Sequence, residues 1–191
     1  MRALYLVLAY LLGGVPFGLI ICKVFKKIDI RKYGSGNIGA TNVGRVVGKK
    51  YAVLVFVLDG CKNFFPVLMA KRFCDMKFSL LVLFAVVIGH VFSFWLKGKG
   101  GKGISSTMLG LLALDYKLGI MMMVVWLVVF TITKISAVAA LFSVATITVA
   151  SYFILGYYYF FVLFIMSIVI FFAHRKNIRR LLEGKELGFK N

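Results

Sequence analysis

Acidic residues are scarce in this chain, which has 6 Asp and Glu against 24 Lys and Arg among 191 residues. Protein sites for Mg²⁺ and Zn²⁺ draw mainly on carboxylate, imidazole and thiolate ligands. The shortage of carboxylates therefore argues against a dedicated metal site, and we expect neither a metal nor a cofactor. The three cysteines form no C-x-x-C pair, which also argues against a disulfide framework.

Several enzyme signatures are missing as well. The phosphate-binding pattern G-x-x-x-x-G-K-[ST] does not occur, which disfavours nucleotide hydrolysis. Neither His90 nor His174 has an Asp five residues further on, so the H-x-x-x-x-D signature of acyl-CoA-dependent glycerolipid acyltransferases is absent. Asp59-Gly60 is not followed by the x-x-A-R of CDP-alcohol phosphotransferases.

Apolar residues dominate what is present. They make up 62% of the sequence, and the mean hydropathy is +0.97, well above the soluble average. Most of the apolar runs approach the ~20 residues of helix that cross a bilayer. We expect an all-α integral membrane protein with one polytopic domain over residues 1–191 and with membrane lipid as its surroundings. The apolar runs are 4–22, 51–70, 78–96, 104–114, 118–133, 135–155 and 157–173.

The basic residues lie almost entirely between these runs. Residues 23–50 hold eight basic residues and one acid, 97–103 hold three basic residues, and 174–191 hold six with two acids. Net charge alone would allow a nucleic-acid partner, but this distribution is that of cytoplasmic loops. It predicts no nucleic-acid binding, an outside amino terminus and a cytoplasmic carboxyl terminus. Residues 71–77 would then be external, a mild violation of the rule.

The run at 104–114 is short. Eleven helical residues rise about 16 Å, against a hydrocarbon core of ~30 Å. If 97–103 and 174–191 share one side, either this run also crosses or one of the long runs does not. We predict about seven transmembrane helices, with a short, partly recessed helix after the glycine-rich loop.

Two loop motifs have the chemistry of anion sites. S-G-N-I-G-A-T-N at 35–42, followed by Arg45, combines close backbone approach, neutral donors and a forked cation. K-G-K-G-G-K-G at 97–103 precedes a helix, whose free N–H groups and dipole attract anions. The alternatives are a Gly/Asn turn with a Thr41 or Asn42 helix cap, and a flexible basic turn.

A third motif opens the carboxyl-terminal segment. His174 and Asn177 lie close together at helical spacing, beside several cations. A basic membrane anchor would explain the cations but not these two residues.

Isolated polar residues outside the three motifs each have two interpretations. Asp59 and Lys62 form a structural ion pair, or Lys62 reaches a site. His90 bridges helices or acts in catalysis, and Ser136 binds an anion or caps a helix.

The three motifs together resemble one family. S-G-N-I-G-A-T-N-V-G-R, G-H-V-F-S-F-W-L-K-G-K-G-G-K-G and H-R-K-N-I-R-R-L-L-E-G-K-E are similar to the bacterial acyl-phosphate:glycerol-3-phosphate acyltransferases of the PlsY type, over 13–186. The resemblance implies acyl transfer from acyl phosphate to the 1-hydroxyl of sn-glycerol 3-phosphate, giving 1-acyl-glycerol 3-phosphate and phosphate. This is the first step of phospholipid synthesis, at the cytoplasmic side of the bacterial inner membrane. It also implies an upstream enzyme that forms the acyl phosphate.

The resemblance also implies roles for residues. Arg45 and Lys102, with Ser136, would bind the phosphate of glycerol 3-phosphate, and the base is either His174 or a substrate phosphate. A transporter of phosphorylated anions and a scaffold for anionic lipid are the rival functions. The expected catalytic residues are His174, Asn177, Lys102 and Ser35, and the expected substrate-binding residues are Asn37, Gly39, Thr41, Asn42, Arg45, His90, Gly100, Gly101, Gly103 and Ser136.

Overall fold

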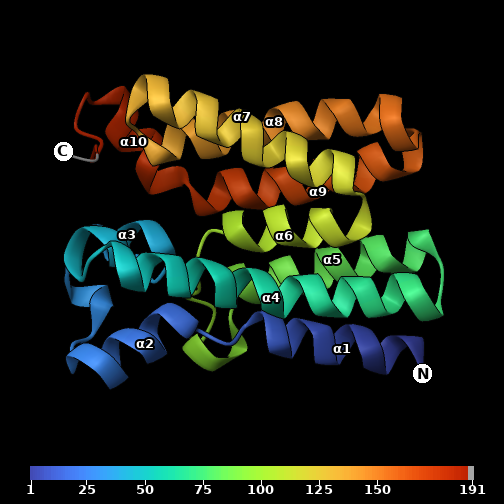
Figure 1. Ribbon diagram of the computed structural model, residues 1–191, viewed down its shortest axis with the longest axis horizontal. Coiled ribbons are helices and arrows are strands. Elements are labelled where there is room, and N and C mark those ends of the chain that lie inside the picture. Colours follow the sequence, from blue (N-terminus) through green and yellow to red (C-terminus); the bar gives the residue numbers. More distant parts are fainter. Residues whose placement is uncertain (189–191) are drawn as a thin grey trace.

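The computed structural model describes residues 1–188, and all its regular elements are helical (Figure 1). Each of the seven apolar runs has become helix. The elements are α1 (Arg2–Gly13), α2 (Phe17–Lys26), η1 (Ile30–Lys32), α3 (Ala40–Val46), α4 (Lys49–Phe73), α5 (Met76–Val91), η2 (Phe94–Leu96), α6 (Ile104–Leu114), α7 (Tyr116–Thr133), α8 (Ser136–Leu155), α9 (Tyr157–Ala173) and α10 (Arg175–Leu182).

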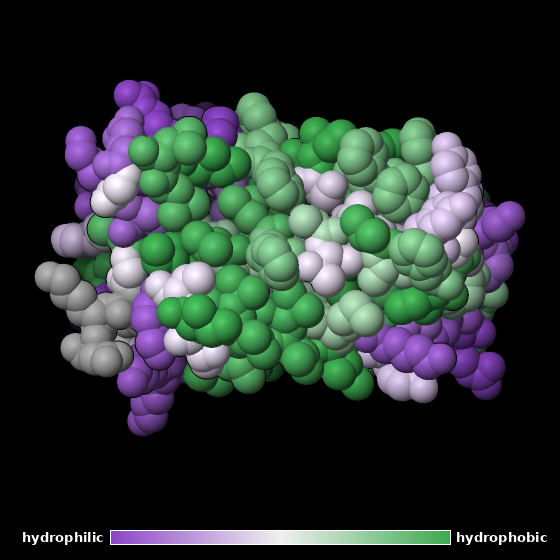
Figure 2. Space-filling view, turned by 90° about the horizontal axis from the view of Figure 1, so that it is seen from above, coloured by the Kyte–Doolittle hydropathy of each residue, from purple (hydrophilic) through white to green (hydrophobic). Residues whose placement is uncertain are grey.

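The protein is an integral membrane protein. Five segments are long and apolar enough to cross a bilayer, namely Arg2–Lys26, Lys49–Phe73, Met76–Leu96, Tyr116–Thr133 and Ser136–Leu155. A sixth is the pair α9 and α10, which bends by 61° at the junction. Figure 2 shows an apolar belt between two hydrophilic ends, as expected of a surface that faces lipid. The number of crossings, predicted as seven, depends on α6.

Helix α6 is the short apolar helix that the sequence predicts, with the same bounds, 104–114. It packs between α4 and α7, and it begins well inside the molecule rather than at its end (Figure 1). At its carboxyl end, Lys71 Nζ donates to the carbonyl of Leu114 at 2.8 Å. A cation at this position satisfies a carbonyl that has no partner inside the helix.

The first apolar run, expected to be one continuous helix, is broken between α1 and α2. Pro16 precedes α2 and cannot donate a backbone hydrogen bond. The break leaves carbonyl groups that must find donors inside an apolar environment. Ser93 Oγ donates to the carbonyl of Gly14 at 2.6 Å, and Lys62 Nζ donates to that of Val15 at 2.7 Å. Side chains of the following helices therefore hold this break in place.

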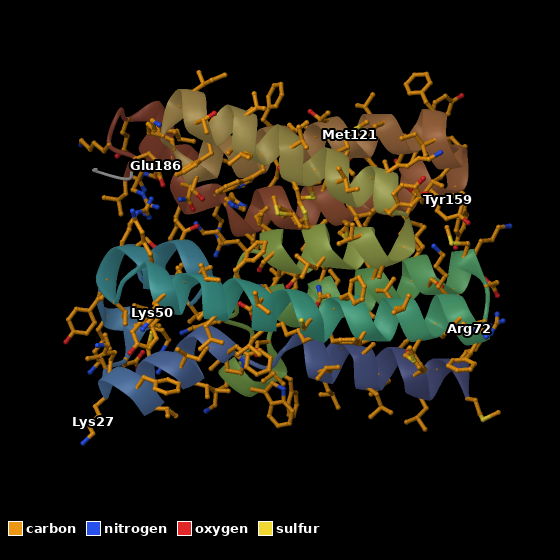
Figure 3. All side chains as sticks on the ribbon, viewed as in Figure 1. Lys27, Lys50, Arg72, Met121, Tyr159 and Glu186 are labelled. Carbon is orange, nitrogen blue, oxygen red and sulfur yellow. The ribbon has the colours of Figure 1, made fainter. Side chains whose placement is uncertain are left out.

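The two ends of the helical bundle differ. Figure 1 shows α3, α10 and the carboxyl-terminal segment at one end and the amino terminus at the other. Figure 3 shows Glu186, Lys27 and Lys50 at the first end, opposite Arg72 and Tyr159. The three basic segments that carry the motifs thus approach one another on one side of the bundle.

Candidate active site

One large cavity, of about 750 Å³, lies at the end that carries the motifs. Residues from five separated parts of the sequence line it, and these parts are 35–56, His90 at the end of α5, 102–108 at the start of α6, 123–140 on α7 and α8, and 174–186. It is polar toward the end of the bundle and apolar toward its middle. Its volume is that of a site for a small organic ligand.

The first motif folds around the side chain of Asn42. Asn42 Oδ1 accepts from the backbone N–H of Ser35 at 2.8 Å. Its Nδ2 donates to the carbonyls of Tyr33 and Asn37 at 3.0 and 2.8 Å. Both its amide hydrogens are therefore used within the protein, and Asn42 shapes the loop. It also lines the cavity, and its predicted contact with a substrate stays a prediction. Asn37 Oδ1 accepts from Gly39 N–H at 2.7 Å and tightens the same turn.

Two contacts join this motif to distant segments. Thr41 Oγ1 and Ser136 Oγ lie 3.1 Å apart, which connects α3 to the start of α8. Arg45 Nη2 donates to the carbonyl of Leu187 at 2.6 Å, which connects α3 to the carboxyl-terminal segment. Thr41, Ser136 and Arg45 all line the cavity.

The glycine-rich loop lies against the end of α5. The N–H of Gly100 donates to the carbonyl of Val91 at 3.0 Å, and that of Gly101 to the carbonyl of His90 at 2.9 Å. These two amides are engaged, and neither residue lines the cavity. The structure therefore does not bring their N–H groups to the cavity, because the carbonyl groups that end α5 accept them, and their predicted contact with a substrate stays a prediction.

Gly103 does meet the cavity, at the start of α6. Its φ of +83° belongs to the left-handed region that favours glycine. The turn places the first two residues of α6, Ile104 and Ser105, at the cavity. Because the first N–H groups of a helix have no partner within it, they can attract an anion.

His174 and Asn177 lie together at the bend between α9 and α10. His174 Nδ1 is 2.8 Å from the carbonyl of Ile170, which can only accept a hydrogen bond. Nδ1 of the neutral ring therefore carries the proton, and Nε2 is an acceptor. Asn177 Nδ2 donates to Glu186 Oε1 at 2.7 Å, and Arg180 Nε donates to Glu186 Oε2 at 2.8 Å.

Burial and neighbouring charges lower the pKa values of Lys102 and His174 at the site. Burial lowers the pKa of Lys102 to about 8, and repulsion by Arg180 and Arg45 acts in the same direction, whereas Glu186 raises it. Burial also lowers the pKa of His174 to about 4, and the Lys102 charge adds to this effect. His174 is thus neutral near pH 7 and is suited to accept a proton rather than to donate one.

The apolar part of the cavity exists because α6 is short. Along its own length α6 lies between α4 and α7. Beyond the amino-terminal end of α6, α4 and α7 face each other across the cavity. Val53 on α4 and Leu127 on α7 line this part and are also 62% and 56% exposed on the outer surface. The cavity therefore reaches the lipid-facing surface between the two helices. Its other apolar lining residues include Ala52, Phe56, Met108, Met123, Trp126 and Phe130.

Most of the predicted residues meet at this cavity. Sequence reasoning missed Glu186, although it is one of only two acids in a cationic tail. It also missed Lys49, Lys134 and Ser105, which lie two to four residues along the sequence from predicted residues. The predicted residues that line the cavity are Ser35, Asn37, Gly39, Thr41, Asn42, Arg45, His90, Lys102, Gly103, Ser136, His174 and Asn177.

Comparison with known proteins identifies the family. Residues 3–184 match the family model for glycerol-3-phosphate acyltransferase. The glycerol-3-phosphate acyltransferase of Wolbachia pipientis subsp. Culex pipiens (strain wPip) is 42% identical over 190 residues, which are 98% of each chain. The chain belongs to the glycerol-3-phosphate acyltransferase family. Glycerol-3-phosphate acyltransferase 2 of Thermotoga maritima is 36% identical over 184 residues, 96% of this chain and 94% of the relative.

Two crystal structures share the acyltransferase fold. Both are of PlsY (YgiH), an integral membrane glycerol 3-phosphate acyltransferase, and both are 33% identical to this chain and cover 99% of it. The glycerol 3-phosphate form has a TM-score of 0.94 and matches over 96% of its own length. The lysophosphatidic acid form has a TM-score of 0.91 and matches over 95%. The resemblance found in the motifs is confirmed: this chain is a membrane-bound glycerol-3-phosphate acyltransferase, and not a transporter or a lipid scaffold.

Proposed function

We propose that this acyltransferase takes its acyl group from acyl phosphate. It transfers the group to the 1-hydroxyl of sn-glycerol 3-phosphate and releases 1-acyl-glycerol 3-phosphate and inorganic phosphate, as the first step of phospholipid synthesis. The observation that carries this proposal is the divided cavity: its outer part gathers Arg45, Lys102 and the start of α6, and its inner part is apolar and reaches lipid between α4 and α7. A phosphate head with an acyl chain fits such a site, and so does a small, water-soluble phosphate ester beside it.

The cationic half suits a pair of anions. Two phosphates that must approach within reacting distance repel each other unless the site neutralises them. Arg45 and Lys102, with Ser136, hold the phosphate of glycerol 3-phosphate. Ser35, Asn37 and Thr41 hold the head of the acyl phosphate, with the N–H groups of Gly103 and of the first turn of α6. The hydrogen bond between Thr41 and Ser136 supports adjoining positions for the two phosphates.

The chemistry needs no further activation of the donor, because acyl phosphate is a mixed anhydride. The glycerol oxygen forms a bond to the acyl carbon, and the bond from that carbon to the phosphate oxygen breaks. Its electron pair leaves with phosphate. The hydroxyl proton passes to Nε2 of His174 or to a phosphate oxygen of a substrate, and Asn177 orients the hydroxyl. A positioned base contributes roughly 10²–10⁴-fold to rate.

The proposal includes an orientation. One domain, residues 1–191, crosses the bacterial inner membrane seven times, with α6 as a short, recessed crossing. The amino terminus lies outside, and the cavity and the carboxyl terminus face the cytoplasm. An enzyme that forms acyl phosphate acts upstream of this one. The loops at the cavity end hold most of the Lys and Arg residues, which supports this orientation by the positive-inside rule.

A direct assay tests the donor and the site together. Purified protein receives glycerol 3-phosphate with either an acyl phosphate or the matching acyl-CoA, and both acyl-glycerol 3-phosphate and released phosphate are measured. We expect equal amounts of the two products from acyl phosphate and no product from acyl-CoA. Turnover with acyl-CoA alone would contradict the proposed donor.

Two variants then test the residues. Lys102→Ala removes a cation from the phosphate site, and Asn177→Ala removes the amide that we place beside the hydroxyl. Each should lower kcat/KM by roughly 10²-fold or more, the size of effect seen when one stabilising donor is lost. If both variants keep wild-type turnover while they remain folded, the residue assignments are wrong even though the activity stands.

A further inference from the structure

A pair of opposite charges lies deep in α4 and has no part in the proposed reaction. Lys62 Nζ and Asp59 Oδ1 are 2.7 Å apart, and both side chains are 2% exposed. Charges inside a membrane protein are costly and commonly mark functional sites. A buried ion pair can often be replaced by apolar residues without loss of stability. The pair therefore calls for an explanation beyond folding.

Both partners hold elements other than α4. Lys62 Nζ also donates to the carbonyl of Val15 at 2.7 Å, at the break between α1 and α2. The backbone carbonyl of Asp59 accepts from Ser106 Oγ, in the first turn of α6, at 3.3 Å. The pair thus connects the broken first span to the end of α6 that borders the cavity.

The carboxylate of Asp59 also faces His90, at the end of α5. Asp59 Oδ1 lies 3.9 Å from His90 Nδ1, too far for a hydrogen bond but close enough to be in contact with the ring. Nδ1 is buried and has no hydrogen-bond partner in the part of the chain that the structure describes. Asp59 therefore packs against the His90 ring and restricts its position.

The His90 ring in turn supports the glycine-rich loop. A Cβ atom at Gly101 would collide with the ring, so the loop backbone lies directly on it. Lys102 is the next residue and enters the cavity. A shift of the His90 ring would move the Lys102 backbone.

We propose that Asp59 and Lys62 are positioning residues for the phosphate site. Through His90 and Ser106 they fix Lys102 and the start of α6 relative to Arg45, without touching a substrate themselves. This inference rests on the proposed binding of glycerol 3-phosphate by Lys102. It differs from a purely structural ion pair, because it predicts a specific change in substrate binding in a protein that is still folded.

The test is the combined variant Asp59→Asn with Lys62→Met, assayed with acyl phosphate and glycerol 3-phosphate. Removing both charges avoids an unpaired buried charge, which would destabilise the fold. We expect the KM for glycerol 3-phosphate to rise roughly tenfold while kcat stays within about threefold, because a displaced cation weakens substrate and transition state alike. Circular dichroism and thermal unfolding monitor the fold.

Lys71→Met is the matched control. It removes the cation that holds the other end of α6, at Leu114, far from the cavity. Its KM should stay within about twofold of wild type. If the combined variant does not fold, Ser106→Ala replaces it, since this change removes only the hydroxyl link from α6 to Asp59. A rise of about threefold in KM is then expected.

Two outcomes would overturn the inference. An unchanged KM in the folded variant would make the pair structural only, and a loss confined to kcat would mean that the pair acts on the chemical step. The Lys102→Ala variant separates this inference from the proposed function. If Lys102→Ala itself leaves KM and kcat unchanged, the assignment of the phosphate site is wrong, whatever the combined variant does.

Discussion

Lys102 is a cation at the proposed phosphate site whose charge depends on its surroundings. Burial lowers its pKa to about 8, and Arg180 and Arg45 reinforce the shift. A lysine with that pKa is still protonated at pH 7 but loses its charge within the range accessible to an enzyme assay. If Lys102 binds a substrate phosphate, the affinity of the free enzyme for that substrate depends on this proton.

The pH dependence of kcat/KM for glycerol 3-phosphate should therefore fall as pH rises through about 8, because kcat/KM reports ionisations of the free enzyme. Lys102→Arg keeps a charge throughout the accessible range, so in this variant the falling limb should move to higher pH. Its overall rate will be lower, since the forked guanidinium does not reproduce the ammonium geometry, and the shape of the profile is the relevant measurement. Identical limbs in both proteins would show that another group titrates.

Glu186 modulates the same ionisation from the opposite side. Its negative charge raises the pKa of Lys102, so Glu186→Gln should move the falling limb to lower pH. Glutamine keeps an oxygen that can accept from Asn177 or Arg180. Glu183→Gln is the control, because Glu183 pairs with Arg179 at 2.9 Å on the exposed side of the same segment. Its profile should match wild type, and an equal shift in the two variants would point to a general charge effect.

At the scale of elements, sequence patterns predicted the helices well and their backbone contacts poorly. The bounds of α6 followed directly from its apolar run. The break after Gly14 was missed because that run is apolar on both sides of Pro16. Gly100 and Gly101 were assigned to an anion because a glycine-rich turn before a helix suits one. Their actual partners are the carbonyls of Val91 and His90 at the end of α5, which lie 9 and 11 residues earlier in the sequence, and only the packed structure reveals these contacts.

The same contrast explains the candidate site. Arg45 and His174 were predicted from the chemistry of their side chains within the motifs, and both line the cavity. Asn42 looked equivalent, but three nearby backbone groups use its amide. Glu186 was missed because an acid in a cationic tail suggests a solvent-exposed ion pair, whereas its side chain is in fact 3% exposed.

The glycine-rich loop should be intolerant of a side chain at Gly101 and tolerant of one at Gly98. A Cβ at Gly101 meets the His90 ring, whereas a Cβ at Gly98 has nothing within 4 Å. Gly101→Ala must lift the loop and displace Lys102, so kcat/KM should fall by roughly tenfold or more. Gly98→Ala places alanine at a φ of +79°, which costs about 1–2 kcal/mol, and should retain activity within about threefold. Equal losses in the two variants would contradict the packing of the loop on His90.

At the scale of the whole molecule, the arrangement of loops determines the side of the membrane on which substrates are used. The end that holds the cavity also holds Lys27, Lys50 and Glu186, and the opposite end holds Arg72 (Figure 3). Glycerol 3-phosphate is charged and does not cross lipid unaided, so the cavity must open to the compartment that contains it. Val53 and Leu127 line the cavity and are exposed on the outer surface, so we propose that an acyl chain moves between the cavity and lipid at this position without leaving an apolar environment.

The natural cysteines provide a test of this orientation. Cys74 is exposed at the end opposite the cavity, between α4 and α5, whereas Cys22 is buried. With Cys61→Ser as background, a membrane-impermeant maleimide added to intact cells should label Cys74 from outside.

A second protein carries Cys74→Ser as well and has Lys176→Cys on α10. Its labelling should require broken cells, because Lys176 is exposed at the cavity end. Labelling of both sites in intact cells would indicate leakage of the reagent. If the Lys176→Cys site alone were labelled from outside, the cavity would face away from the cytoplasm, and the enzyme could not draw on cytoplasmic glycerol 3-phosphate.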